Sequence, residues 1–217
     1  IIIPNKCLNV NDSKKFNRLF TFYSSNIKDN SISTDCEFGL EILPSQILSE
    51  IIKADNCDFL YNRLTPRKFL FKRMTVSEIL TWQKREIRNP LLLMTNEFDK
   101  LSSLQMFRNL LNYMKDRKSS KPPLDHVRKF LRIVHECSPI VKDEAYLQVY
   151  KQINKNKKKE SLLLGFKFLA FLSSSFTPES QDIYHLILSF LFFQRNIIYD
   201  ENIIKHINYI FVRMVKT

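Results

Sequence analysis

Glycine is almost absent from this chain, and this scarcity constrains the fold more than any other feature of the sequence. Only Gly39 and Gly165 occur among the 217 residues. An all-β fold joins its strands through tight turns, many of which need glycine at positive backbone φ. Eighteen phenylalanines and many leucines and isoleucines instead suit densely packed helices. The sequence therefore predicts an all-α fold, a compact multi-helix bundle with a sizeable core.

The helical signals are clearest between residues 143 and 179. Apolar and aromatic side chains recur with the 3.6-residue period at Ala145, Tyr146, Val149, Tyr150 and Ile153. Asp143 and Glu144 precede them, and in a first helical turn they would interact favourably with the helix dipole. An almost wholly apolar helix follows, with Ser161 predicted as its N-cap. Gly165, in the interior of that helix, would let a neighbouring helix approach closely.

Capping residues and prolines predict further helix boundaries. The segment Thr75-Val76-Ser77-Glu78 fits a capping box, and the helix that it opens is predicted to end before Asn89-Pro90. Thr177 and Pro178 are predicted as the N-cap and the first residue of a later helix. The last predicted helix follows Asp200.

The domain organisation is predicted from the distribution of apolar residues. Residues 1–60 hold too few of them for an independent fold, so we expect a helical N-terminal extension packed on a domain of residues 61–217. The chain begins with Ile1, which indicates a fragment of a longer protein. The apolar runs at residues 162–176 and 183–193 are shorter than the roughly 20 residues that span a bilayer, so buried core helices are expected.

Patterns typical of catalysis or metal binding are not found in the sequence. The histidines, at positions His126, His135, His185 and His206, have no metal-ligand spacing. Two glycines cannot supply a phosphate-binding loop. The cysteines Cys7, Cys36, Cys57 and Cys137 form no Cys-x-x-Cys pair, which favours reduced thiols and a cytoplasmic location. We predict no catalytic, cofactor-binding or metal-binding residues and no enzymatic activity.

The residues between 143 and 179 resemble a known family, the myosin tail homology 4 domain. Its pattern places an acidic pair before Tyr-x-Gln and a basic residue followed by Gln, and then has Ser…Arg-Gly-Trp and Phe-x-Pro. The matching residues are Asp143, Glu144, Tyr146, Gln148, Lys151, Gln152, Ser161, Gly165, Phe176 and Pro178. Leu164 replaces the family's arginine and Phe166 its tryptophan.

Earlier residues extend the resemblance to roughly residues 74–194. Ile79-Leu80-Thr81-Trp82 and Pro90-Leu91-Leu92 resemble the opening of the family's domain, and Phe107 with residues 112–117 resembles its next helix. The spacing is similar to that in Rho GTPase-activating proteins, which form one branch of the family. Unconventional myosin tails and plant kinesins form others.

This resemblance implies a non-catalytic protein-binding module of a larger cytoskeletal or Rho-signalling protein. In an activator of Rho GTPases, the catalytic arginine would belong to a separate domain outside this chain. Relatives in motor tails bind microtubules or cargo, so the resemblance also implies association with the cytoskeleton. An alternative is a structural domain that braces a neighbouring RhoGAP or FERM domain and has no ligand of its own.

Basic charge is the remaining functional signal, with a formal net charge of +12. Two clusters supply the predicted partner-binding residues Lys84, Arg85, Arg88, Lys151, Lys155, Lys157, Lys158 and Lys159. They could form an electrostatic footprint for an acidic protein, with tubulin or microtubules favoured, or simply a solvated face. The phenylalanines lie in apolar helices, which disfavours nucleic acid. An anionic membrane surface is a third alternative.

Overall fold

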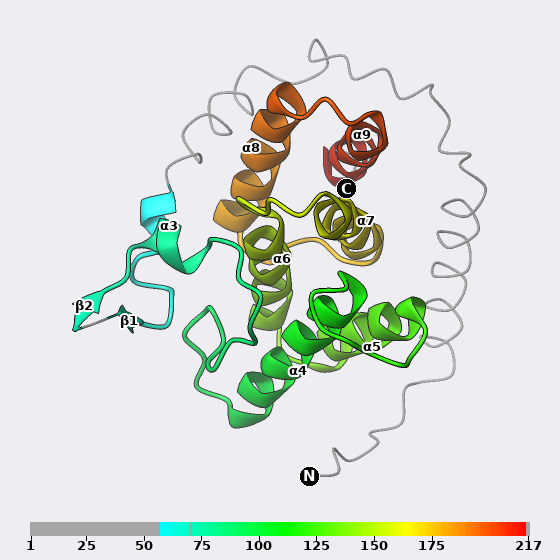
Figure 1. Cartoon of the computed structure of the whole chain (residues 1–217). Helices are drawn as coiled ribbons and strands as arrows, with labels where there is room; N and C mark the ends of the chain where they lie inside the picture. The colour runs from blue at the N-terminus through cyan, green and yellow to red at the C-terminus, as the bar shows by residue number, and fades with distance from the viewer. Residues whose placement is uncertain (1–56, 70, 216–217) are drawn as a thin grey trace.

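The structure is a computed structural model that describes residues 57–69 and 71–215 (Figure 1). Most of the predicted N-terminal extension at residues 1–60 lies outside the described residues. Its last four residues form the 3₁₀ helix η2 (Cys57–Leu60). Leu60 is completely buried, so the hydrophobic core of the described part includes at least this residue of the extension.

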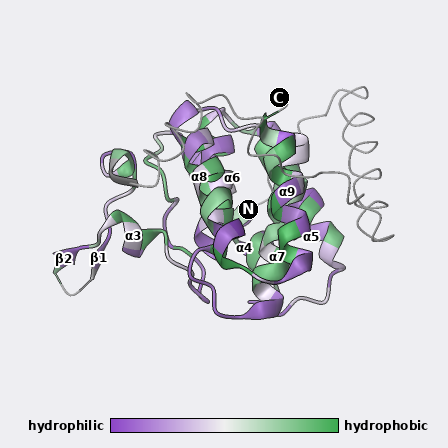
Figure 2. Cartoon of the chain, turned by 90° about the horizontal axis from the view of Figure 1, so that it is seen from above, coloured by the Kyte–Doolittle hydropathy of each residue, from purple (hydrophilic) through white to green (hydrophobic). Residues whose placement is uncertain are grey.

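The described residues include a short irregular arm (residues 61–69 and 71–82) and six longer helices after it, which confirms the all-α prediction. The arm contains β1 (Lys68–Phe69), β2 (Lys72–Arg73) and α3 (Val76–Ile79). The helices are α4 (Glu97–Tyr113), α5 (Pro123–Glu136), α6 (Ile140–Ile153), α7 (Lys159–Ser175), α8 (Gln181–Ile197) and α9 (Glu201–Val215). The two strands pair antiparallel and project away from the bundle in both views (Figures 1 and 2). No helix in the described part of the chain is long and apolar enough to cross a membrane.

Helix α6 lies at the centre of the bundle and contacts α4, α5, α7 and α8 (Figure 1). Helices α7 and α9 pack on each other, and Figure 2 shows them opposite α6 and α8. From Val141 to Ile153 every residue of α6 except Lys142 is buried. The predicted apolar stripe is therefore present, but the polar side of this helix is buried as well.

The capping box is confirmed, although the helix that it opens has only one turn. The backbone N–H of Thr75 donates to Glu78 Oε2 over 2.7 Å, and the N–H of Glu78 donates to Thr75 Oγ1 over 3.3 Å. The prediction that this helix extends to Asn89-Pro90 is wrong, because α3 ends at Ile79. Side chains of α6 and its C-cap bind the carbonyl groups of residues 79–81, which a continuing helix would bond internally.

Two other predicted caps are also wrong. Helix α7 begins at Lys159, so Ser161 is its third residue and is buried. Helix α8 begins at Gln181, four residues after Thr177. A distant carboxylate replaces the predicted cap there, since Asp143 Oδ1 accepts from the backbone N–H groups of residues 179 and 180. The prediction of a last helix after Asp200 is confirmed, because α9 begins at Glu201. The Oδ1 of Asp200 accepts a hydrogen bond from the N–H of the second residue of α9 over 3.0 Å.

Gly165 lies where α7 packs closely against its neighbours, as the sequence predicts. A Cβ atom added there would lie 2.8 Å from Cγ1 of Ile153 and 2.9 Å from Cε of Met114. Both distances are shorter than carbon atoms normally approach. Helix α7 can therefore pack this closely on α6 and the end of α4 because position 165 has no side chain.

Candidate protein-binding surface

The buried polar face of α6 holds the segments that carry the predicted basic residues. Its buried polar residues are Asp143, Glu144, Gln148, Lys151 and Gln152. Buried polar groups are destabilising unless they are hydrogen-bonded. Residues 63–92, together with the segment that precedes α8, provide most of the partners. The side-chain amide of Gln152 has no hydrogen-bond partner among the described residues, and nothing in the structure explains its presence there.

Asp143 joins the arm to the start of α8. Its Oδ2 accepts a hydrogen bond from Nη2 of Arg63 over 3.1 Å, and its Oδ1 accepts from the backbone N–H groups of Glu179 and Ser180. Arg63 Nη1 also donates to Ser180 Oγ over 2.9 Å. The carboxylate therefore cross-links three segments, a larger role than the predicted interaction with its own helix dipole.

Glu144 holds the segment before α4 against the bundle. Its two carboxylate oxygens accept from the backbone N–H groups of Leu91 and Leu92 over 2.8 and 2.7 Å. Gln148 Nε2 donates to the same carboxylate over 2.8 Å. Complete burial raises the pKa of Glu144, and these three donors together with the charge of Arg67 oppose the rise. Its position in the second turn of α6 makes it a tertiary anchor rather than a helix-end residue.

Lys151 is buried and is not available to a partner, which corrects the inclusion of this residue in the predicted surface. Its side chain is among the largest that are fully buried. Nζ donates to the carbonyl oxygens of Ile79 and Thr81, each over 2.6 Å. Burial, with a smaller contribution from the charge of Arg67, lowers the pKa of Lys151 to about 7. Lys151 therefore fixes the end of α3.

Asp116 joins the two predicted basic clusters. Its Oδ2 accepts from Nε1 of Trp82 over 3.1 Å and from Oγ of Ser161 over 2.9 Å, and its Oδ1 accepts from Nζ of Lys158 over 2.9 Å. The Lys158 ammonium also lies 4.9 Å from the centre of the Trp82 ring, within the range of a cation–π contact. The backbone N–H of Trp82 donates to the backbone carbonyl oxygen of Asn154 over 3.0 Å. The segment that leads into Lys84 is thus fixed to the corner between α6 and α7.

The remaining predicted cations are exposed on these two segments. They are Lys84, Arg85 and Arg88 after Trp82, and Lys155, Lys157, Lys158 and Lys159 at the corner between α6 and α7. Nζ of Lys155 donates to Ser77 Oγ over 3.4 Å, which is a third contact between the arm and the corner between α6 and α7. Its φ of 58° places it in the left-handed region, where the chain turns from α6 towards α7. We name these seven residues the basic surface.

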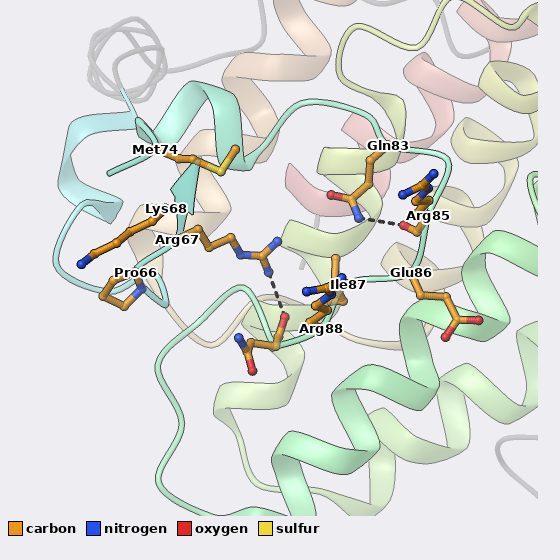
Figure 3. Close-up of a pocket in the computed structure, with 10 residues that line it drawn as sticks. Pro66, Arg67, Lys68, Met74, Gln83, Arg85, Glu86, Ile87 and Arg88 are labelled. Carbon is orange, nitrogen blue, oxygen red and sulfur yellow. Dashed lines mark hydrogen bonds between the residues drawn. The ribbon is translucent and has the colours of Figure 1, made fainter. Parts of the chain in front are cut away.

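An open pocket of about 410 Å³ lies beside the basic surface (Figure 3). It is lined by Pro66, Arg67, Lys68, Met74, Gln83, Arg85, Glu86, Ile87, Arg88 and Asn89. Figure 3 shows Arg67 extending from the β1 side towards residues 85–89, where its Nη2 donates to Asn89 O over 2.8 Å. No motif in the sequence predicts this pocket. The only signal for it was the density of basic residues between 61 and 90.

The histidines have structural partners, and no cluster of potential metal ligands occurs within residues 57–69 and 71–215. His126 bonds Ser119 Oγ and Asn109 Oδ1, and His206 Nδ1 lies 2.6 Å from the carbonyl oxygen of Asn202. Burial lowers the pKa of both imidazoles, which therefore favour the neutral form.

The two departures from the family pattern both lie in α7. Phe166, at the tryptophan position, is fully buried and stacks on Phe190 with ring centres 6.4 Å apart. Leu164, at the arginine position, is partly buried and packs against the core. An apolar contact therefore replaces the polar contact expected of an arginine.

Comparison with known proteins agrees with the fold and the resemblance. The model of the MyTH4 domain matches residues 128–217. The structure is similar to the myosin VII MyTH4-FERM MF1 domain of Dictyostelium discoideum, with a TM-score of 0.65 and 18% identity over 80% of this chain and 34% of that one. It is also similar to a mutant of the MF2 domain of the same myosin, with a TM-score of 0.63 and 22% identity over 73% of this chain and 32% of that one. The chain spans about a third of these solved structures.

The fold is that of the helical part of these solved structures, in which a MyTH4 domain occurs beside a FERM domain of a myosin. Residues 128–217 match the model of the MyTH4 domain, and the described part of the chain has the fold of these MyTH4-containing structures. This confirms the family resemblance. The matched range begins within α5, whereas the structural similarity covers more of the chain.

Proposed function

We propose that this chain is a non-catalytic protein-binding module that uses the basic surface to bind an acidic protein, with microtubules as the favoured partner. One observation carries the proposal. Two basic segments about 70 positions apart are fixed to each other by Asp116, which binds both Trp82 and Lys158. Exposed cations held on fixed segments present a defined positive field, and such fields attract acidic partners.

Individual exposed ion pairs contribute about 0–1 kcal/mol, so several must act together. A flexible, glutamate-rich segment such as the tail of tubulin suits this surface, since lysines interact as point charges with little geometric selectivity. Cytoskeletal localisation is part of the same proposal. We also propose that the longer parent protein acts in Rho signalling. A GTPase assay of the full-length parent would test this.

Microtubule co-sedimentation tests the proposal. Lys155, Lys157 and Lys159 are changed together to glutamate, while Lys158 is kept because it binds the buried Asp116. The matched control reverses three exposed lysines elsewhere, Lys118, Lys129 and Lys205, and so changes the net charge equally. The wild type and the control are expected in the pellet at low salt, and the corner variant in the supernatant.

Removal of the acidic tails of tubulin is expected to have the same effect as the corner variant, and binding is expected to weaken as salt rises. Equal loss in the corner variant and the control would indicate a general charge effect and contradict the proposal. A wild type that stays in the supernatant at low salt would also contradict it.

The alternative role is to brace an adjacent domain such as FERM, and exposed apolar side chains favour it. Ile197, the last residue of α8, is 63% exposed, and Tyr199, in the loop before α9, is 92% exposed. The similar solved structures contain a FERM domain and are about three times as long as the aligned part. If Ile197→Ser and Tyr199→Ser lowered the melting temperature of the parent but not that of this chain, the bracing role would be favoured.

A further inference from the structure

The pocket beside the basic surface has a strong excess of positive charge. Four basic residues line it, Arg67, Lys68, Arg85 and Arg88. Glu86 is the only acidic residue among the described residues of its lining, and it is already paired. Its Oε2 accepts from Arg108 Nε over 2.7 Å, and its Oε1 lies 3.0 Å from Arg117 Nε. Glu86 therefore does little to neutralise the cations of the pocket.

Arg67 is the least solvated of these cations. Burial is the main cause that lowers its pKa, although the charge of Glu144 opposes the change. The nearby Glu144 carboxylate is already bound by Leu91, Leu92 and Gln148. A second buried amine, Lys151, interacts with Arg67 as a like charge. The interior behind the pocket therefore does not fully compensate the positive charge of Arg67.

Arg67 also has donors to spare. The one side-chain hydrogen bond that the described residues offer it goes from Nη2 to Asn89 O, and Nε is buried without a partner. A guanidinium carries five N–H donors in a planar fork that matches a carboxylate. In a partly desolvated pocket, such a charge-assisted pair is stronger than the same pair in water.

We propose that this pocket is a specific subsite for a carboxylate side chain of an acidic peptide, held by the guanidinium groups of Arg67, Arg85 and Arg88. The inference rests on the proposed function and deepens it. One carboxylate of the acidic partner would bind in the pocket, while the other acidic residues would be attracted less specifically by the basic surface. The volume lies within the roughly 300–1,000 Å³ of small-ligand sites. A guanidinium fork matches a phosphate as well as a carboxylate, so the choice of a carboxylate follows from the glutamate-rich partner of the proposed function.

Fluorescence anisotropy with a labelled peptide of six glutamates tests the subsite at low ionic strength. The double variant Arg85→Gln with Arg88→Gln is expected to weaken binding about tenfold or more, as expected for the loss of charge-assisted hydrogen bonds. The control Arg132→Gln with Lys118→Gln removes two exposed charges elsewhere, and we expect less than a threefold change. Arg88→Lys keeps the charge but not the fork, so it is expected to weaken binding several-fold.

Amide chemical shifts locate the bound peptide independently of affinity. In the wild type, the N–H signals of Gln83, Arg85 and Asn89 are expected to move on addition of the six-glutamate peptide. A peptide of six glutamines is expected to leave them unchanged. Equal weakening in the pocket variant and its control, with no shifts at the pocket, would overturn the inference. Tighter binding of a phosphoserine peptide that displaces the glutamate peptide would overturn the choice of carboxylate.

The same variants in microtubule co-sedimentation separate this inference from the proposed function. If microtubule binding depends on Lys155, Lys157 and Lys159 but not on Arg85 and Arg88, the proposed function stands and the subsite is wrong. If the glutamate peptide binds at the pocket while microtubules are not bound, the subsite is supported and the favoured partner is wrong.

Discussion

The ammonium group of Lys151 donates to the carbonyl oxygen of Ile79, 72 positions earlier in the chain, over 2.6 Å. Similar long-range contacts link Glu144 to Leu91 and Asp143 to Arg63. The charged residues that give this stretch its family resemblance therefore act together in one structural task. They attach the irregular residues 61–92 to the central helix of the bundle.

Substitution of Lys151 tests this structural role. In Lys151→Met, the carbonyl groups of Ile79 and Thr81 lose their buried donor. Each unsatisfied buried group costs about 1–3 kcal/mol, so we expect a clear fall in the free energy of unfolding by chemical denaturation. Lys155→Met, at an exposed position, is the control. If the two variants unfolded at the same denaturant concentration, Lys151 would not be a structural anchor.

The lowered pKa of Lys151 gives a pH dependence of known sign. Its pKa is about 7 in the folded protein and 10.5 in the unfolded chain. Between these values the unfolded chain binds more protons, so the contribution of Lys151 to stability rises with pH. The difference in unfolding free energy between the wild type and Lys151→Met is expected to grow from pH 7 to pH 9.5. A constant or shrinking difference would contradict the lowered pKa.

Contacts between neighbouring residues could be predicted from the sequence, whereas contacts between distant residues could not. The helices, the capping box at Thr75 and the start of the last helix after Asp200 could be predicted, because periodicity and capping depend on neighbouring residues. The early end of α3 and the capping of α8 by Asp143 depend on partners far along the chain. No local pattern marks such partners.

The candidate site shows the same limit. The lysines of residues 151–159 are alike in the sequence, yet Lys151 is buried and Lys157 is exposed. Helical phase alone could not separate them, since α6 is buried on every side and ends at Ile153. The pocket around Arg67 brings together the arm and residues 83–89, so its shape could not be derived from the charge count.

The close approach at Gly165 predicts a steric penalty. Gly165→Leu is expected to destabilise the protein by about 1–3 kcal/mol through overpacking. Gly165→Ala combines a short contact with Ile153 and a gain in helix propensity of about 1 kcal/mol, so the two effects oppose each other. Thermal unfolding of Gly165→Ala, with and without Ile153→Ala, separates them in a double-mutant cycle. A Gly165→Leu variant with an unchanged melting temperature would show that position 165 is not a close contact.

The single tryptophan reports directly on the junction at Asp116. Trp82 donates to Asp116 Oδ2, and this bond helps to hold residues 80–96 against the α6–α7 corner. Asp116→Ala is expected to shift the Trp82 emission to longer wavelength and to increase its quenching by acrylamide. Asp125→Ala, which removes a carboxylate on α5 paired with Arg128, is the control. An unchanged spectrum in Asp116→Ala would mean that Trp82 is held without this carboxylate.

Lys157 and Lys158 are adjacent but are expected to differ in function. Lys158 binds Asp116, whose side chain is only 1% exposed, whereas Lys157 is exposed and has no such bond among the described residues. Lys158→Met should therefore lower the unfolding free energy by about 1–2 kcal/mol, as expected for loss of a hydrogen bond to a charged group. Lys157→Met should leave stability unchanged and weaken binding to microtubules at low salt. Chemical denaturation and co-sedimentation of both variants would contradict this division if Lys157→Met lost stability, or if Lys158→Met kept all of it.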